Sequence, residues 1–155
     1  MSESSRSTVA TRARWLRSLS LWGPPAIFAL AIFGFSSLSA PPAPPQQLSD
    51  KHVHALVFAG LALLLVRALA DARWSDVTVA TGVQAAVLAI TYGATDEWHQ
   101  SFVPGRHAEV LDLAADAVGV IAAVGLLCAA AWWDRRTGRP NGRIERAAGK
   151  VGQTP

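Results

Sequence analysis

Four long apolar runs limit what this chain can fold into more than any other feature of its sequence. They cover residues 19–38, 53–69, 77–95 and 117–133, and their only lysine, arginine or acidic residue is Arg67. A helix needs about 20 apolar residues to cross the roughly 30 Å hydrocarbon core of a bilayer. Because lipid offers the backbone no water to bond, each run should be helical. The sequence therefore predicts an all-α integral membrane bundle of four transmembrane helices.

The basic residues between these runs are sorted by side. If all four runs span, 12 of the 14 lysines and arginines share one side, and only Lys51 and Arg106 lie on the other. The positive-inside rule then predicts that both termini are cytoplasmic. Five of the six tryptophans fall at the same ends, as an interfacial belt would: Trp15, Trp22, Trp74, Trp132 and Trp133. We expect a basic tail over residues 1–18, a membrane domain over 19–134 with spans at about 19–38, 53–69, 77–95 and 112–133, and a basic tail over 135–155.

Other features exclude or qualify alternative classes. Charged residues make up 16% of the chain, where a soluble domain has about 25%. The net charge of +3 does not indicate nucleic-acid binding, since no aromatic or helical pattern accompanies the arginines. The single cysteine, Cys128, excludes a disulfide framework. Residues 6–40 could alternatively be a signal peptide cleaved after Ala40. Residues 39–50 hold four of the nine prolines and predict an extended outer connector.

Histidines and carboxylates gather on the predicted outer side. All four histidines lie there, with six of the eleven acids: Asp50, Asp96, Glu97, Glu109, Asp112 and Asp116. A topology rule explains why arginine is scarce outside, but it does not explain this gathering. Ionisable groups at membrane depth cost a few kcal/mol and are functional candidates by default.

Helical spacing places several of these residues on common faces. Asp50 and His54 are four residues apart, and so are Asp112 and Asp116, whose stripe continues through Gly119 and other small residues that allow close helix approach. The third run carries a polar stripe that we expect to face the bundle: Thr81, Gln84, Thr91 and Thr95. These polar faces predict a shallow polar pocket near the outer surface.

The loop over residues 102–107 presents a lone outer arginine. Pro104 and Gly105 predict a turn, and the turn exposes Arg106. A guanidinium suits bidentate capture of a carboxylate or phosphate group. Arg106 could bind a ligand in this way, or it could pair internally with an acid and hold the loop shut. The internal partners that we consider are Glu97, Asp112 and Asp116.

Three motifs in order resemble the VanZ-like family of membrane proteins. They are Asp50-Lys51-x-x-His54, then Tyr92-Gly93-x-x-x-Glu97-x-x-Gln100-x-Phe102-x-Pro104-x-Arg106, then Asp112-x-x-x-Asp116-x-x-Gly119, and together they cover about residues 50–125. The family commonly has asparagine where this chain has Asp116. The resemblance implies a multi-pass protein of the bacterial inner (cytoplasmic) membrane. It also implies a link to the glycopeptide teicoplanin, because the family's namesake confers low-level resistance to it.

Three functional hypotheses follow. In the first, an outer pocket binds a lipid-linked or cell-wall-related anionic group, and its expected ligand-binding residues are Asp50, Lys51, Tyr92, Gln100, Arg106, Asp112 and Asp116. In the second, the chain is an intramembrane enzyme acting on an envelope lipid. Glu97 would be the acid or base, and His54, oriented by Asp50, would shuttle the proton. Arg106 would stabilise the developing negative charge. In the third, the polar groups only hold the helices together.

Cofactors and partners are predicted with the same residues. No contiguous ligand signature such as H-E-x-x-H is present, so we expect no cofactor and no metal. A divalent ion held by Asp112, Asp116, Glu97 and His54 is the alternative. Membrane lipids and a lipid-linked or cell-wall ligand are the expected partners, without nucleic acid, and the oligomeric state stays open.

Overall fold

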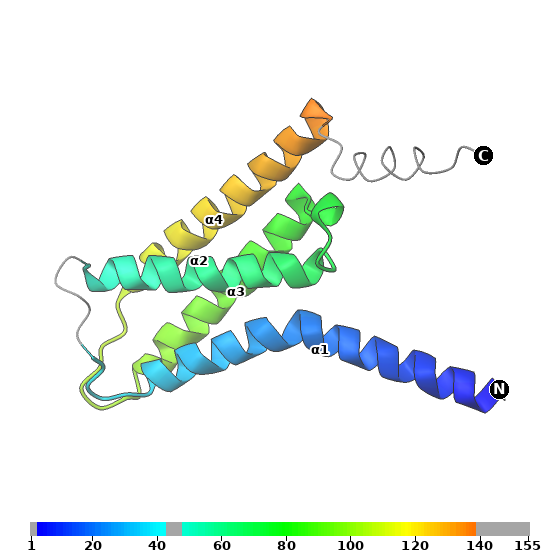
Figure 1. Ribbon diagram of the computed structural model, residues 1–155. Helices are drawn as coiled ribbons and strands as arrows, with labels where there is room; N and C mark the ends of the chain where they lie inside the picture. Colours follow the sequence, from blue (N-terminus) through cyan, green and yellow to red (C-terminus); the bar gives the residue numbers. More distant parts are fainter. Residues whose placement is uncertain (1–2, 43–47, 139–155) are drawn as a thin grey trace, which may run out of the picture.

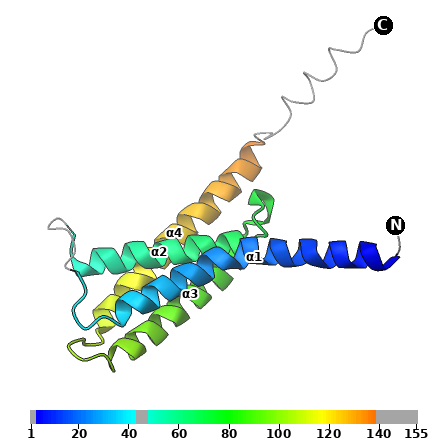
Figure 2. The ribbon, with the colours of Figure 1, turned by 60° about the horizontal axis from the view of Figure 1, so that its bottom comes forward.

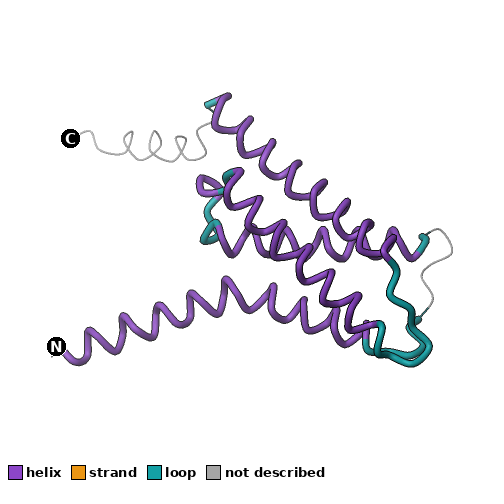
Figure 3. The backbone as a smooth tube through the Cα atoms, turned by 180° about the vertical axis from the view of Figure 1, so that it is seen from behind, coloured by secondary structure: helices purple, strands orange, loops and turns teal. Residues whose placement is uncertain are grey.

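The computed structural model describes residues 3–42 and 48–138, and most of these residues are helical. The helices are α1 (Glu3–Ser36), α2 (Asp50–Leu69), α3 (Val79–Gln100) and α4 (Val110–Thr137), with a short 3-10 helix, η1 (Trp74–Asp76), before α3. The α1–α2 and α3–α4 connections lie at one end, and the α2–α3 connection lies at the other (Figures 1 and 3). No strand occurs within these two described ranges, which confirms the all-α prediction there.

Three helices among the described residues are long and apolar enough to cross a membrane. They are the Thr11–Ser36 part of α1, α2 and α4. The four-span prediction is therefore supported for three of its helices, and α3 as a fourth span stays a prediction. The polar residues of α3 lower its mean hydropathy, and its last turns carry two carboxylates, Asp96 and Glu97.

Polar side chains at the helix starts explain where α2 and α3 begin. The backbone N–H of Ser49 donates to His52 Nδ1 at 3.2 Å, so that α2 starts at Asp50 within the connector expected over residues 39–50. At α3, Thr78 Oγ1 accepts from the Thr81 N–H at 3.2 Å, and Thr81 Oγ1 accepts from the Thr78 N–H at 2.8 Å. These bonds satisfy backbone donors that a helix start leaves open.

The predicted boundaries differ most at the two ends of the chain. The first helix starts at Glu3, within the basic tail expected over residues 1–18, because its polar residues continue the helical backbone past the apolar run. The fourth helix runs from Val110 to Thr137 and ends at Gly138, whose φ of 59° is left-handed. Of the expected C-terminal tail, residues 139–155 lie outside the described residues, as do residues 43–47 of the connector.

Helix α2 lies between the other helices and packs most closely against α4. A Cβ atom placed on Gly119 would lie 1.9 Å from the carbonyl oxygen of Ala55, so the two backbones touch at this crossing. Small residues allow this approach, which confirms the small stripe predicted through Asp112, Asp116 and Gly119. The buried apolar core continues along α2 with Phe58, Leu61, Ala62, Leu65 and Val66.

The face of α3 that packs inward is not the one predicted. Gln84, Thr91 and Thr95 are exposed, so the expectation that their polar stripe faces the bundle is wrong. The buried face of α3 instead consists of Gly82, Ala85, Ala89, Gly93, Asp96, Glu97 and Gln100. Close packing decides which face of α3 turns inward. Lipid is as apolar as a helix interface, so burying apolar side chains gains little, whereas small residues let the helices come close.

Helix α1 is only partly attached to the bundle. Its C-terminal half contacts α2 and α3, while its N-terminal part extends beyond them (Figure 2). Pro24 and Pro25 lie inside α1, where a proline removes an intrahelical hydrogen bond and bends the helix. The loose contact leaves space between α1 and α2.

The end predicted to be cytoplasmic is held together by its basic and aromatic residues. Arg17 Nε of α1 donates to Asp71 Oδ1 at 3.0 Å, Arg135 Nη1 of α4 donates to the Val77 carbonyl at 2.8 Å, and Trp74 Nε1 donates to Asp134 Oδ2 at 3.0 Å. In the loop before α3, hydrogen bonds from Arg73 hold the pKa of the Asp76 carboxyl below its usual value. The arginines on which the topology prediction rests therefore also tie the helix ends together.

Candidate functional site

A pocket of about 590 Å³ opens at the predicted outer end of the bundle. Its apolar wall comes from α1, α2 and the connector between them: Phe28, Ala31, Ile32, Phe35, Pro41, Pro42, Val53, Val57 and Phe58. Its polar residues come from α1, α2, α3 and the α3–α4 loop: Ser36, Asp50, His54, Asp96, Gln100 and Arg106. The pocket is therefore mainly apolar with a cluster of polar groups, a combination typical of small-molecule sites.

Gln100 is the centre of a buried network on one side of the pocket. Its side chain is 2% exposed, and its Nε2 donates to Asp96 Oδ2 at 2.9 Å and to Glu97 Oε1 at 3.4 Å. Its Oε1 accepts from Arg106 Nη2. The other oxygen of Glu97 accepts from the backbone N–H of Glu109 at 2.9 Å. One amide therefore joins the last turn of α3 to the loop that carries Arg106.

Asp96 is a site residue that the motif analysis left out of its ligand set. Its Oδ2 accepts from the Ser36 hydroxyl of α1 at 2.8 Å, and its Oδ1 is buried without a hydrogen-bond partner. A buried acceptor without a partner costs about 1–3 kcal/mol, so a donor from a ligand would be favourable here. The signal in the sequence was the spacing of four residues between Asp96 and Gln100, which puts both on the inward face of α3.

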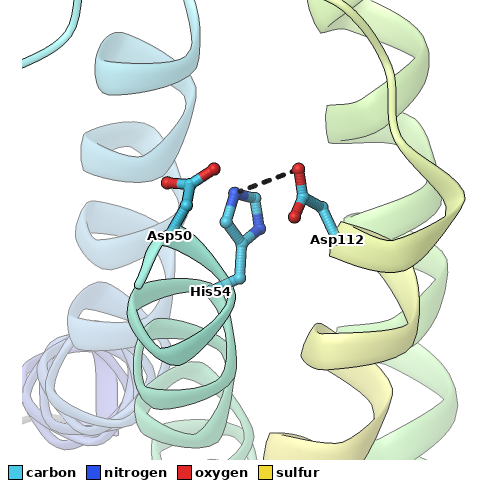
Figure 4. Close-up of side chains that lie close together, drawn as sticks. All are labelled: Asp50, His54 and Asp112. Atoms are coloured by element: carbon cyan, nitrogen blue, oxygen red, sulfur yellow. Dashed lines mark ion pairs between the residues drawn. The ribbon is translucent and has the colours of Figure 1, made fainter. Parts of the chain in front are cut away.

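A second cluster surrounds the imidazole of His54. His54 Nδ1 lies 3.0 Å from Asp116 Oδ1, and His54 Nε2 lies 4.0 Å from Asp112 Oδ2. Figure 4 shows the ring between Asp50 of its own helix and Asp112 of α4. The sequence predicted that Asp50 orients His54, but the hydrogen bond that orients the ring comes from Asp116 on α4. Glu97 approaches the same group from α3.

Lys51 neutralises part of this acidic end. Its Nζ lies 2.6 Å from Glu109 Oε2 and also bonds the buried carboxylate of Asp112. Lys51 is therefore committed to two carboxylates of this chain. It does not line the pocket, so a direct ligand contact stays a prediction for this residue.

Arg106 has a different environment. Among the described residues it makes no ion pair, and its partner is the uncharged amide of Gln100. The internal pairing with Glu97, Asp112 or Asp116 that the sequence left open is not formed. A guanidinium that faces a pocket and bonds only a neutral group keeps donors for an anion.

The structure brings most of the predicted site residues together. Asp50, His54, Gln100 and Arg106 line the pocket, and Glu97, Asp112 and Asp116 lie directly behind them. Tyr92 is not among the lining residues, because its hydroxyl donates to the Ala29 carbonyl at 2.7 Å and ties α3 to α1. The sequence missed this contact, since nothing local reveals which helix a tyrosine faces.

A comparison with protein families matches the VanZ/LLP1 family model over residues 8–132. The chain belongs to the VanZ/LLP1 family. No curated protein and no solved structure matches the chain significantly. The resemblance carried by the three motifs is thus confirmed, and the match extends it through most of α1. With its three helices that could span a bilayer among the described residues, this VanZ/LLP1 chain is a multi-pass membrane protein.

The His54 cluster and the Arg106 network both lie within residues 8–132, the part of the chain that the family model matches. Helices α3 and α4 of this VanZ/LLP1 chain contribute buried carboxylates, and α2 contributes the half-buried imidazole of His54. Such an arrangement can bind an anion at Arg106, exchange a proton between His54 and a carboxylate, or hold a cation.

Proposed function

We propose that this VanZ/LLP1 protein binds an amphiphilic molecule of the cell envelope, with an acyl chain in the apolar part of the pocket and an anionic group at Arg106. The observation that carries the proposal is the composition of the pocket, whose apolar wall from α1 and α2 ends in six polar side chains. The volume of about 590 Å³ lies within the range of about 300–1,000 Å³ that is usual for ligand pockets.

The polar end of the pocket favours a headgroup with both acceptors and donors. Arg106 supplies a cation whose charge is unpaired among the described residues, and it suits a phosphate or carboxylate. Asp96 Oδ1 has no partner, and it suits a hydroxyl or ammonium group on the same molecule. Lipid-linked and cell-wall precursors, anionic lipids and acylated glycopeptides all combine these groups.

Orientation and location are part of the proposal. The connections that border the pocket lie opposite the end where Arg17, Arg73 and Arg135 gather. By the positive-inside rule, we place both termini in the cytoplasm and the pocket on the outer side of the bacterial inner membrane, with α3 as the fourth span. A pocket there could sequester or compete for teicoplanin, which would link binding to glycopeptide tolerance.

The binding proposal is tested by removing the guanidinium. The full-length protein in nanodiscs of neutral lipid is titrated with lyso-phosphatidylglycerol, with its zwitterionic match lyso-phosphatidylcholine, and with teicoplanin. We expect Arg106→Ala to weaken lyso-phosphatidylglycerol binding about 10- to 100-fold, because a hydrogen bond to a charged group contributes about 1.5–3 kcal/mol.

The matched control is Arg73→Ala, which removes an arginine from the opposite end, where its side chain is 61% exposed. This variant should bind like wild type. Equal affinity of wild type and Arg106→Ala for lyso-phosphatidylglycerol would remove Arg106 from the site and contradict the proposal.

An intramembrane enzyme acting on an envelope lipid is the second candidate. It is favoured by the contact of 3.0 Å between His54 Nδ1 and Asp116 Oδ1, next to the buried carboxylate of Glu97. Glu97 would serve as acid or base, His54 as proton shuttle and Arg106 as anion stabiliser. Incubation with a lipid extract followed by mass spectrometry tests this candidate. Glu97→Gln should bind lipid but lose conversion about 10²- to 10⁴-fold, and equal conversion by both proteins would exclude Glu97 from catalysis.

A further inference from the structure

Three helices direct metal-ligating side chains to one point beside the pocket. His54 comes from α2, Glu97 from α3 and Asp116 from α4, and one ligand atom from each lies within 4.8 Å of the others. The donor atoms of a tetrahedral Zn²⁺ site are each about 2.0–2.2 Å from the ion and therefore lie about 3.3 Å from one another. Small side-chain rotations would therefore bring all three donors onto one ion.

An unpartnered oxygen at this point is free to bind a cation. Asp116 is 1% exposed, and its Oδ2 is buried without any hydrogen-bond partner. This oxygen faces α3, because a Cβ atom on Gly93 would lie 3.0 Å from it. Glu97 follows one turn later on the same buried face of α3. The orphaned oxygen is thus aimed at the side from which the second carboxylate approaches.

Neighbouring groups already orient two of the three side chains, Glu97 and His54. Glu97 is held by the Glu109 N–H at 2.9 Å and by the Gln100 amide at 3.4 Å. The second nitrogen of His54 faces Asp112 Oδ2 at 4.0 Å, and Asp112 is in turn bonded to Lys51. A carboxylate behind a ligating histidine is the usual outer partner in metal sites.

We infer that His54, Glu97 and Asp116 bind a divalent transition-metal ion, Zn²⁺ or Mn²⁺. The imidazole favours Zn²⁺ over Mg²⁺ and Ca²⁺, which prefer all-oxygen ligands, and the two carboxylates also suit Mn²⁺. Because His54 also lines the pocket, the pocket provides an entry path and a fourth, open position. From the sequence we expected no metal, with a divalent ion at Asp112, Asp116, Glu97 and His54 only as the alternative. The reason is that the ligands come from three separate helices and form no contiguous signature.

The metal site can be measured without any amphiphile, and lipid binding can be measured in the presence of a chelator. Ligation would also occupy Glu97 and His54, so that neither could act as the free acid or base of the enzyme candidate. If the protein binds the metal, Glu97 and His54 are therefore ligands and not the acid and base of an enzyme.

The experiment uses the full-length protein in detergent, stripped with a chelator and then titrated with ZnCl₂ by calorimetry and with MnCl₂ by electron paramagnetic resonance. We expect one ion per chain for wild type and at least tenfold weaker binding for Asp116→Asn, which keeps the size of the side chain. The control is Asp134→Asn, the same change at the other end of α4, where the carboxylate accepts from Trp74. This control should bind like wild type.

Glu97→Gln serves as the second variant if Asp116→Asn fails to fold, and it should lose affinity by the same factor. Circular dichroism and gel filtration verify that each variant is folded before titration. Binding of less than 0.1 equivalent of either ion by wild type would overturn the inference, as would wild-type affinity in a folded Asp116→Asn or Glu97→Gln protein. In that case the two carboxylates would more simply share a proton.

Discussion

Gly119→Ala is expected to destabilise this protein by about 3 kcal/mol, although it adds a single methyl group. The added Cβ would lie 1.9 Å from the oxygen, 2.6 Å from the carbonyl carbon and 2.8 Å from the Cα of Ala55. These are backbone atoms of α2, so no side chain can rotate away and the two helices must separate. Overpacking of a well-packed core usually costs about 1–3 kcal/mol, and a backbone clash lies at the upper end.

The same change should also disrupt the site. Ala55 follows His54 directly in α2, and Gly119 lies one turn after Asp116 in α4. Moving these helices apart lengthens the contact of 3.0 Å between His54 Nδ1 and Asp116 Oδ1. We therefore expect ligand and metal affinity to fall together with stability.

Thermal and denaturant unfolding of the purified protein in detergent measures this effect. The matched control is Gly125→Ala on the same helix, where a Cβ would meet nothing within 4 Å. Since alanine favours a helix over glycine by up to about 1 kcal/mol, this control should be neutral or slightly stabilising. If Gly119→Ala unfolded at the same temperature as Gly125→Ala, the close crossing of α2 and α4 would be wrong.

Gln100→Leu should cause the second largest effect, a loss of about 2–4 kcal/mol. Leucine fills a similar volume but removes the donor to Asp96 and Glu97 and the acceptor for Arg106. Each buried polar group left without a partner costs about 1–3 kcal/mol, and more if it is charged. Asp96 would keep only the hydroxyl of Ser36.

Binding should respond as strongly as stability to this change. Without the Gln100 amide, nothing else among the described contacts fixes the guanidinium of Arg106 at the pocket. We expect lyso-phosphatidylglycerol affinity to fall at least tenfold, measured in nanodiscs next to the unfolding experiment. The control is Gln84→Leu, the same substitution on the exposed face of α3, which should leave both quantities unchanged. Equal losses in the two variants would show that the network around Gln100 has no special role.

The sequence by itself was enough to predict that the chain lies in a bilayer and that it is built of long helices. Run lengths near 20 residues and the sorting of arginines need no tertiary information, because the thickness of a bilayer and its charge asymmetry act on each segment separately. Spacing along one helix also grouped Asp112, Asp116 and Gly119 correctly, since an α-helix fixes which of its residues share a face. The order of the motifs was enough to predict the family.

Only the tertiary structure decided which faces meet. On α3 the polar stripe was predicted to face inward, but the structure buries a stripe of small residues there instead. Thr95 of the polar stripe donates its hydroxyl to the Tyr92 carbonyl of its own helix. Lipid is as apolar as leucine, so hydropathy does not select the inward face, and backbone proximity does. The approach of α1, α2, α3 and α4 to one another decides which carboxylate bonds His54. It also leaves one oxygen of Asp116 and one of Asp96 without a partner. The distance between helices depends on how all of them pack together, and the sequence of one helix does not reveal it.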